Sequence, residues 1–123
     1  MRVNYKVWIE NDQGQLIIGE GLLALLTAIE KTGSIYKASK ELDMSYRTAW
    51  GKLKKLEERI GLQLAEKRLG GKGGGGTVLT KRGIELLEGF NRLDKEIAKF
   101  AELKFMNHFK SIIPSDDKEN VDF

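Results

Sequence analysis

Residues 33–57, GSIYKASKELDMSYRTAWGKLKKLE, contain two segments with apolar side chains at helical spacing, joined by LDMS. Each segment follows a serine, Ser34 or Ser45, whose hydroxyl can accept a hydrogen bond from an amide in the first turn of a helix. The small side chain of Ala38 allows the two helices to approach closely. We therefore expect two short helices packed as a helix-turn-helix. The apolar faces of the two helices are formed by Ile35, Ala38, Leu42, Ala49, Leu53, Leu56 and Ile60.

The segments on either side extend this pattern. Residues 22–29 place leucine and isoleucine at helical spacing, and Gly33 is suited to end that helix. Two short strand-like segments, residues 62–68 and 77–79, flank a loop in which six of the seven positions 70–76 are glycine. A hairpin with a long tip, placed after a helix-turn-helix, predicts a winged helix-turn-helix.

The N-terminal residues predict a further hairpin. Residues 3–10 alternate apolar and polar side chains, a period of two that is typical of a strand. The turn signal NDQG and the short apolar segment QLII follow, so we expect residues 3–18 to form a β-hairpin. A long last helix is expected from Thr80 to about Phe109.

The fold class that follows is α+β, mainly α. It is a winged helix-turn-helix with an N-terminal β-hairpin and a long C-terminal dimerisation helix. We expect residues 1–110 to form this single domain, because 123 residues usually build only one core. Residues 111–123 form an acidic tail that we expect to be disordered.

Composition excludes several classes of protein. The sequence has no apolar run of 18 residues, no signal-peptide core at its N-terminus and no cysteine for disulfides or thiolate metal sites. We therefore expect a cytoplasmic location. His108 stands apart from other metal-ligand residue types, and no nucleophile–base spacing is present. We expect no catalytic site, no metal and no cofactor.

Positive charge collects in two regions although the net charge is only +3. Residues 36–56 hold six basic side chains and two acidic ones, and residues 65–83 hold five basic and one acidic. Clustered lysine and arginine are the electrostatic footprint of a protein that binds a phosphate backbone. A solvated surface is the simpler alternative.

The outward face of the helix after Ser45 carries residues suited to DNA. Arg47 suits a bidentate contact with guanine, and Tyr46 and Trp50 could pack on thymine methyl groups or sugars. Lysines along the helix suit phosphate contacts. The predicted DNA-binding residues are Ser45, Tyr46, Arg47, Thr48, Trp50, Gly51, Lys54, Lys55, Arg68, Lys72 and Lys81.

The glycine loop has two interpretations. Its glycines match G-x-G-x-x-G formally, but a nucleotide-binding loop would be followed by a helix, whereas TVLT follows here. We therefore expect a wing tip at which bare amides and Lys72 approach phosphates. A phosphate-binding enzyme that uses this loop remains an alternative.

The last helix predicts a contact with a second copy of the chain. Its apolar residues alternate steps of four and three, as in a coiled-coil seam. Packing of the early part of the helix on its own domain is the alternative. The predicted dimer-interface residues are Leu86, Phe90, Leu93, Ile97 and Phe100.

The motifs GSIYKASKELDMSYRTAW and LGGKGGGGTVLTKRG together resemble the N-terminal domain of the molybdate-dependent transcriptional regulator (ModE) family, over about residues 15–95. That domain is related to the winged helix of LysR-type regulators. The resemblance implies a homodimeric regulator whose third helix enters the major groove and whose wing follows the backbone or minor groove. The function that we predict is therefore sequence-specific binding of double-stranded operator DNA. The alternative from another class is a protein-interaction module that uses the winged-helix surface.

Molybdate is a separate question. Full-length members of that family carry a C-terminal pair of small β-barrel domains that bind molybdate, and 123 residues leave no room for them. We therefore expect this chain to lack molybdate sensing, which would require a separate oxyanion-sensing partner protein.

Overall fold

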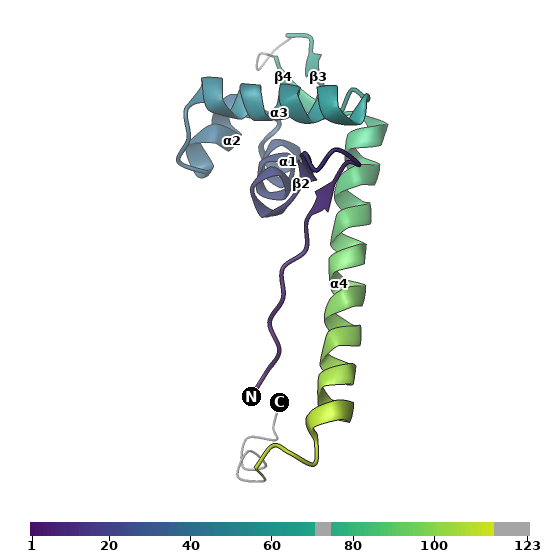
Figure 1. The fold of residues 1–123 in the computed structure, drawn as a ribbon. Coiled ribbons are helices and arrows are strands. Elements are labelled where there is room, and N and C mark those ends of the chain that lie inside the picture. Colours follow the sequence, from purple (N-terminus) through teal and green to yellow (C-terminus); the bar gives the residue numbers. More distant parts are fainter. Residues whose placement is uncertain (71–74, 115–123) are drawn as a thin grey trace. The chain divides into compact units, whose positions relative to one another are not determined.

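The computed structural model describes residues 1–70 and 75–114, and the chain divides into two compact units. The winged-helix unit comprises Val7–Phe90, and the terminal unit comprises Met1–Lys6 with the segment that begins at Asn91. The elements in chain order are β1 (Ile9–Glu10), β2 (Leu16–Ile18), α1 (Glu20–Thr32), α2 (Ile35–Glu41), α3 (Tyr46–Ile60), β3 (Ala65–Arg68), β4 (Gly76–Leu79) and α4 (Lys81–Phe109) (Figure 1).

Serine caps fix the starts of α2 and α3, as predicted. The Ser34 hydroxyl accepts a hydrogen bond from the amide of Lys37 at 3.1 Å, and that of Ser45 accepts one from the amide of Thr48 at 3.0 Å. Each bond satisfies an amide that has no partner within the helix itself. The two helices are therefore set by local side-chain chemistry before any packing is considered.

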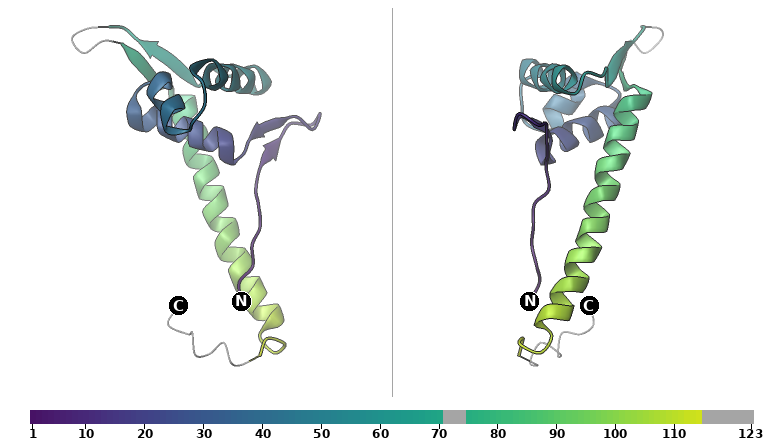
Figure 2. Two further views of the ribbon diagram at one scale, coloured as in Figure 1. Left: turned by 90° about the vertical axis from the view of Figure 1, so that its left-hand side faces the viewer. Right: turned by 45° about the vertical axis from the view of Figure 1, so that its right-hand side comes forward.

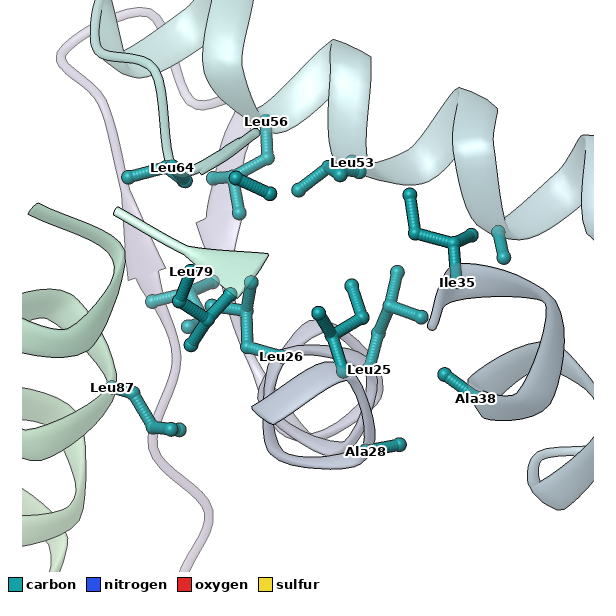
Figure 3. Packing of buried hydrophobic residues seen from close by; sticks show 14 of the residues in the cluster. Leu25, Leu26, Ala28, Ile35, Ala38, Leu53, Leu56, Leu64, Leu79 and Leu87 are labelled. Carbon is teal, nitrogen blue, oxygen red and sulfur yellow. The ribbon is translucent and has the colours of Figure 1, made fainter. Parts of the chain in front are cut away.

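The helices of the winged-helix unit enclose one apolar core, to which α2, α3 and the base of the wing all contribute (Figure 3). Of the apolar residues predicted from helical spacing in α1, α2 and α3, Leu22, Leu42 and Ile60 are only partly buried and the others are buried in this core. Gly33 and Gly61, with φ of 71° and 75°, end α1 and α3. The largest fully buried apolar side chains are Ile18, Leu25, Leu26, Ile29, Leu53, Leu56 and Leu64.

The wing is a two-stranded antiparallel hairpin that starts with the pair Ala65–Leu79 and continues to Arg68–Gly76. The amide of Thr77 donates to the carbonyl oxygen of Gly33 at 2.8 Å, which ties β4 to the end of α1. The wing and the N-terminal hairpin lie on different sides of the three helices (Figure 2). Lys72 and the other residues of the predicted wing tip, 71–74, lie outside the described residues.

The predicted N-terminal strand is wrong for most of its length. Only Ile9–Glu10 pairs with β2, and residues 3–8 form no strand. The pairing ends at Ile9–Ile18, because β2 ends at Ile18 and the chain enters α1 at Glu20. In the terminal unit, the Tyr5 hydroxyl instead donates to the carbonyl oxygen of Asp94 at 3.0 Å.

Thr80 opens α4, as predicted. Its hydroxyl accepts from the amide of Gly83 at 3.1 Å and donates to the carbonyl oxygen of Gln63 at 2.7 Å. Along the part of the chain that the structure describes, no helix is both long enough and apolar enough to cross a bilayer. The acidic end of the predicted disordered tail, residues 115–123, lies outside that part.

We expect Gly83→Ala to lower the free energy of unfolding by about 1–3 kcal/mol, although alanine favours a helix more than glycine. A Cβ at position 83 would overlap the carbonyl oxygen of Leu64. Gly89→Ala is the matched control in the same helix, because a Cβ there would meet nothing within 4 Å. The free energy of unfolding of this control should rise by up to about 1 kcal/mol, because alanine favours a helix more than glycine. Urea denaturation measures both variants, and equal gains would contradict the close contact with Leu64.

Candidate nucleic-acid interface

Helix α3 has a buried face and an exposed face, and the core fixes its orientation. Ala49, Leu53 and Leu56 are at most 1% exposed. Arg47 and Lys55 lie on the opposite, exposed side of the helix. The helix therefore presents a row of polar side chains from a rigid base.

Two cations on the exposed face have no partner within the described chain. The side chains of Arg47 and Lys55 make no hydrogen bond, ion pair or ring contact with any described residue. Their charges are accessible to an external anion without the loss of an internal contact. This arrangement differs from that of Lys54, which has two internal partners.

Gly51 lies between these cations, in the interior of α3. A Cβ at this position would meet nothing within 4 Å, so no close packing inside the chain requires glycine. Glycine in a helix interior costs roughly 0.5–1 kcal/mol relative to alanine. No contact with the described residues accounts for this cost.

Trp50 lies at the junction of α3 and the wing. It is partly buried and packs against the core, so it occupies the edge of the outward arc predicted for it. The Lys54 ammonium lies 4.6 Å from the centre of its ring. A hollow of about 230 Å³ beside them is lined by Trp50, Lys54, Gln63, Ala65, Glu66, Lys67 and Thr77.

Sequence reasoning missed the contribution of α2 to this surface. The rings of Tyr36 and Tyr46 lie with centroids 6.4 Å apart and are both about half exposed. The Lys40 ammonium lies 5.2 Å from the Tyr36 ring centre. The i, i+4 spacing of Tyr36 and Lys40, next to the buried Ile35, is the signal that could have identified them.

The remaining predicted DNA-binding residues are placed as follows. Ser45 and Thr48 are exposed but serve the helix cap, and the Ser45 hydroxyl also donates to that of Thr48 at 2.9 Å. Arg68 is exposed at the end of β3, and Lys81 is exposed at the start of α4. These two residues therefore lie on elements other than α3.

The predicted dimer-interface residues fall into two groups. Phe90 is buried and Leu86 partly buried against the core of the winged-helix unit. In the terminal unit, Leu93 is 40% and Phe100 61% exposed, while Ile97 is partly buried. Further exposed apolar residues of α4 are Leu103, Met106 and Phe109.

The described residues offer no metal site, because residues 1–70 and 75–114 hold no group of three or more metal-ligating side chains in a suitable arrangement. The chemistry of the surface is that of cations, aromatic rings and an open helix backbone. Groups of this kind are suited to contacts with a polyanion.

Residues 21–84 match the family of bacterial regulatory helix-turn-helix proteins described as the lysR family. The molybdenum transport protein ModE of Herbaspirillum seropedicae is 39% identical over 83 residues, 68% of this chain and 31% of that protein. The DNA-binding transcriptional dual regulator ModE of Escherichia coli K12 is 35% identical over 81 residues, 66% of this chain and 31% of that protein. The similarity expected from the motifs is confirmed. The chain spans about 31% of the length of these relatives.

Solved structures show the same fold. ArgP from Mycobacterium tuberculosis is similar with a TM-score of 0.50 and 26% identity, over 69% of this chain and 30% of that one. The chain in the BenM_DBD/benA site 1 DNA complex is similar with a TM-score of 0.50 and 20% identity, over 74% of this chain and 94% of that one. The predicted winged helix-turn-helix fold is thereby confirmed.

Proposed function

The chain belongs to the lysR family of bacterial regulatory helix-turn-helix proteins, and from this premise we propose that it binds duplex DNA and regulates transcription. In this proposal α3 enters the major groove, and the wing follows the backbone or minor groove. An α-helix fits the major groove, where each base pair presents a distinct pattern of donors and acceptors.

The observation that carries the proposal is the exposed face of α3. The side chains of Arg47 and Lys55 have no partner in residues 1–70 and 75–114, and a Cβ at Gly51 between them would meet nothing within 4 Å. A guanidinium near the start of a recognition helix suits guanine, and lysines further along suit phosphates. Gly51 allows the helix backbone to approach the DNA closely.

The aromatic residues and the wing support the same orientation. Tyr46 and Trp50 can pack on sugars or thymine methyl groups, and Tyr36 extends this apolar surface onto α2. Arg68, Lys72 and Lys81 are proposed phosphate contacts, which position a protein on DNA without selecting its sequence.

A homodimer is proposed as the binding species. The terminal unit exposes Leu93, Phe100, Leu103 and Met106 along α4, an apolar surface that a second copy can cover. Two symmetric copies would place two α3 helices on a pseudo-palindromic operator.

The site of action that we propose is the cytoplasm, where a bacterial chromosome lies. One relative is a molybdenum transport protein by name and the other a transcriptional dual regulator. Both are longer than this chain, and transport of molybdenum is said of the first relative only. A separate oxyanion-sensing partner for this chain stays a prediction, which neither the described residues nor these relatives support.

We expect Gly51→Ala to stabilise the fold and weaken DNA binding. The alanine should raise the free energy of unfolding by about 0.5–1 kcal/mol, because its Cβ enters open space. The same Cβ should cost about 1–3 kcal/mol in a closely packed complex. Urea denaturation and anisotropy titration of a labelled operator measure the two effects. Undiminished affinity of the stabilised variant would remove Gly51 from the interface.

We expect Arg47→Ala to cost about 1–3 kcal/mol on a selected operator and to relax preference at one base position. Arg47→Lys is the matched control, since it keeps the charge but loses the planar fork. The lysine should restore much of the affinity for random duplexes without restoring the base preference. Full rescue on the operator would make Arg47 a phosphate contact.

We expect Phe100→Lys to yield a folded monomer, because position 100 is exposed within the chain and a charge there cannot be buried in an apolar dimer interface without a large penalty. Glu102→Lys introduces a cation at an exposed polar position of the same helix and should leave the dimer intact. Sedimentation velocity measures the mass of both. An unperturbed dimer of the Phe100 variant would place the subunit contact elsewhere.

A further inference from the structure

The carboxylate of Glu57 links the recognition helix to the wing. Its side chain is only 10% exposed. One oxygen, Oε2, accepts hydrogen bonds from the amides of Leu64 at 2.7 Å and Ala65 at 3.2 Å. Ala65 is the first residue of β3, so the carboxylate is held in place where the wing begins.

The other oxygen of Glu57 holds a cation of the DNA-facing surface. Oε1 lies 3.3 Å from the Lys54 ammonium, which also lies 4.6 Å from the centre of the Trp50 ring. The Lys54 side chain is 51% exposed, so it remains open to solvent and to an approaching anion. Lys54 thus has two internal partners, the Glu57 carboxylate and the Trp50 ring. The carboxylate cannot move away from Lys54 without losing its hydrogen bonds to the amides of Leu64 and Ala65.

The neighbouring lysine provides a direct contrast. Lys55 is exposed on the same helix and has no partner among the described residues. A phosphate can bind Lys55 without breaking an internal contact. The same phosphate must compete with Glu57 for Lys54, and it is repelled by the carboxylate while it does so.

We propose that Glu57 is a positioning residue that withholds Lys54 from DNA phosphates and so weakens the sequence-independent part of binding. The inference rests on the proposed function and specifies which cations of that surface contribute to it. Binding to random duplexes comes almost entirely from phosphate contacts and counterion release. A cation that is already paired contributes little to this sequence-independent binding. The difference in affinity between an operator and a random duplex then depends on residues that contact bases.

The test compares variants that change the same charge at adjacent positions. Lys54→Met and Lys55→Met are titrated with a random-sequence duplex over a series of salt concentrations. Lys55→Met should lower the slope of log K against log salt by about one, whereas Lys54→Met should leave it nearly unchanged. Equal losses of slope in the two variants would overturn the proposal.

A second pair tests the carboxylate itself. Glu57→Gln keeps an oxygen that can accept from Leu64 and Ala65, but it removes the charge that holds Lys54. Affinity for the random duplex should rise about three- to tenfold, and the slope should steepen by about one. Glu58→Gln changes an exposed neighbouring carboxylate that has no partner in the described part of the chain, and it should change affinity less than twofold.

The double variant separates the proposed pairing from a general effect of charge. Adding Glu57→Gln to Lys54→Met should produce no further change of slope, because the withheld cation is absent. A steeper slope in that background, or equal effects of Glu57→Gln and Glu58→Gln, would overturn the inference. Absence of DNA binding by the unmodified chain at every salt concentration would instead reject the proposed function. Urea unfolding of each variant confirms that the titrated protein is folded.

Discussion

The structure of the winged-helix unit depends on main-chain contacts at the base of the wing. The amide of Thr77 bonds the carbonyl of Gly33 at 2.8 Å, and the amide of Thr80 bonds that of Leu64 at 2.9 Å. Gly76 and Gly83 lie so close to these two carbonyl oxygens that any side chain would collide with them. The wing is therefore placed by backbone against backbone, with no flexible side chain between that could adjust the spacing.

This constraint gives α3 a fixed neighbour. Its buried face is anchored by Leu53 and Leu56. Near its C-terminal end, the Glu57 carboxylate accepts hydrogen bonds from the amides of Leu64 and Ala65, where the wing begins. The exposed face is thereby held in a defined position relative to β3. Cations on such a face gain affinity without the entropy cost of ordering a loop.

Much of the fold was predictable, because local patterns determine it. The caps at Ser34 and Ser45 and the buried stripe of α3 follow from residue types and the period of 3.6. The predicted strand over residues 3–10 was wrong before Ile9 for a non-local reason, since alternation within the segment cannot show that β2 ends at Ile18. Within the candidate site, the exposure of Arg47 follows from the helical period. The pairing of Tyr36 with Tyr46 and the bonds of Glu57 depend on distances between elements, which no single segment contains.

Among the described residues, the side chains of Arg47 and Lys55 have no hydrogen-bonding, ionic or ring partner, which bears on how this face of α3 can change over generations. Replacing an exposed side chain without such a partner costs the fold little, so the residues of this face can vary almost independently of stability. Gly76 and Gly83 have no such freedom, because their substitution would displace the wing. An architecture of this kind can change the chemistry of one face of one helix by single substitutions, while its scaffold stays nearly invariant.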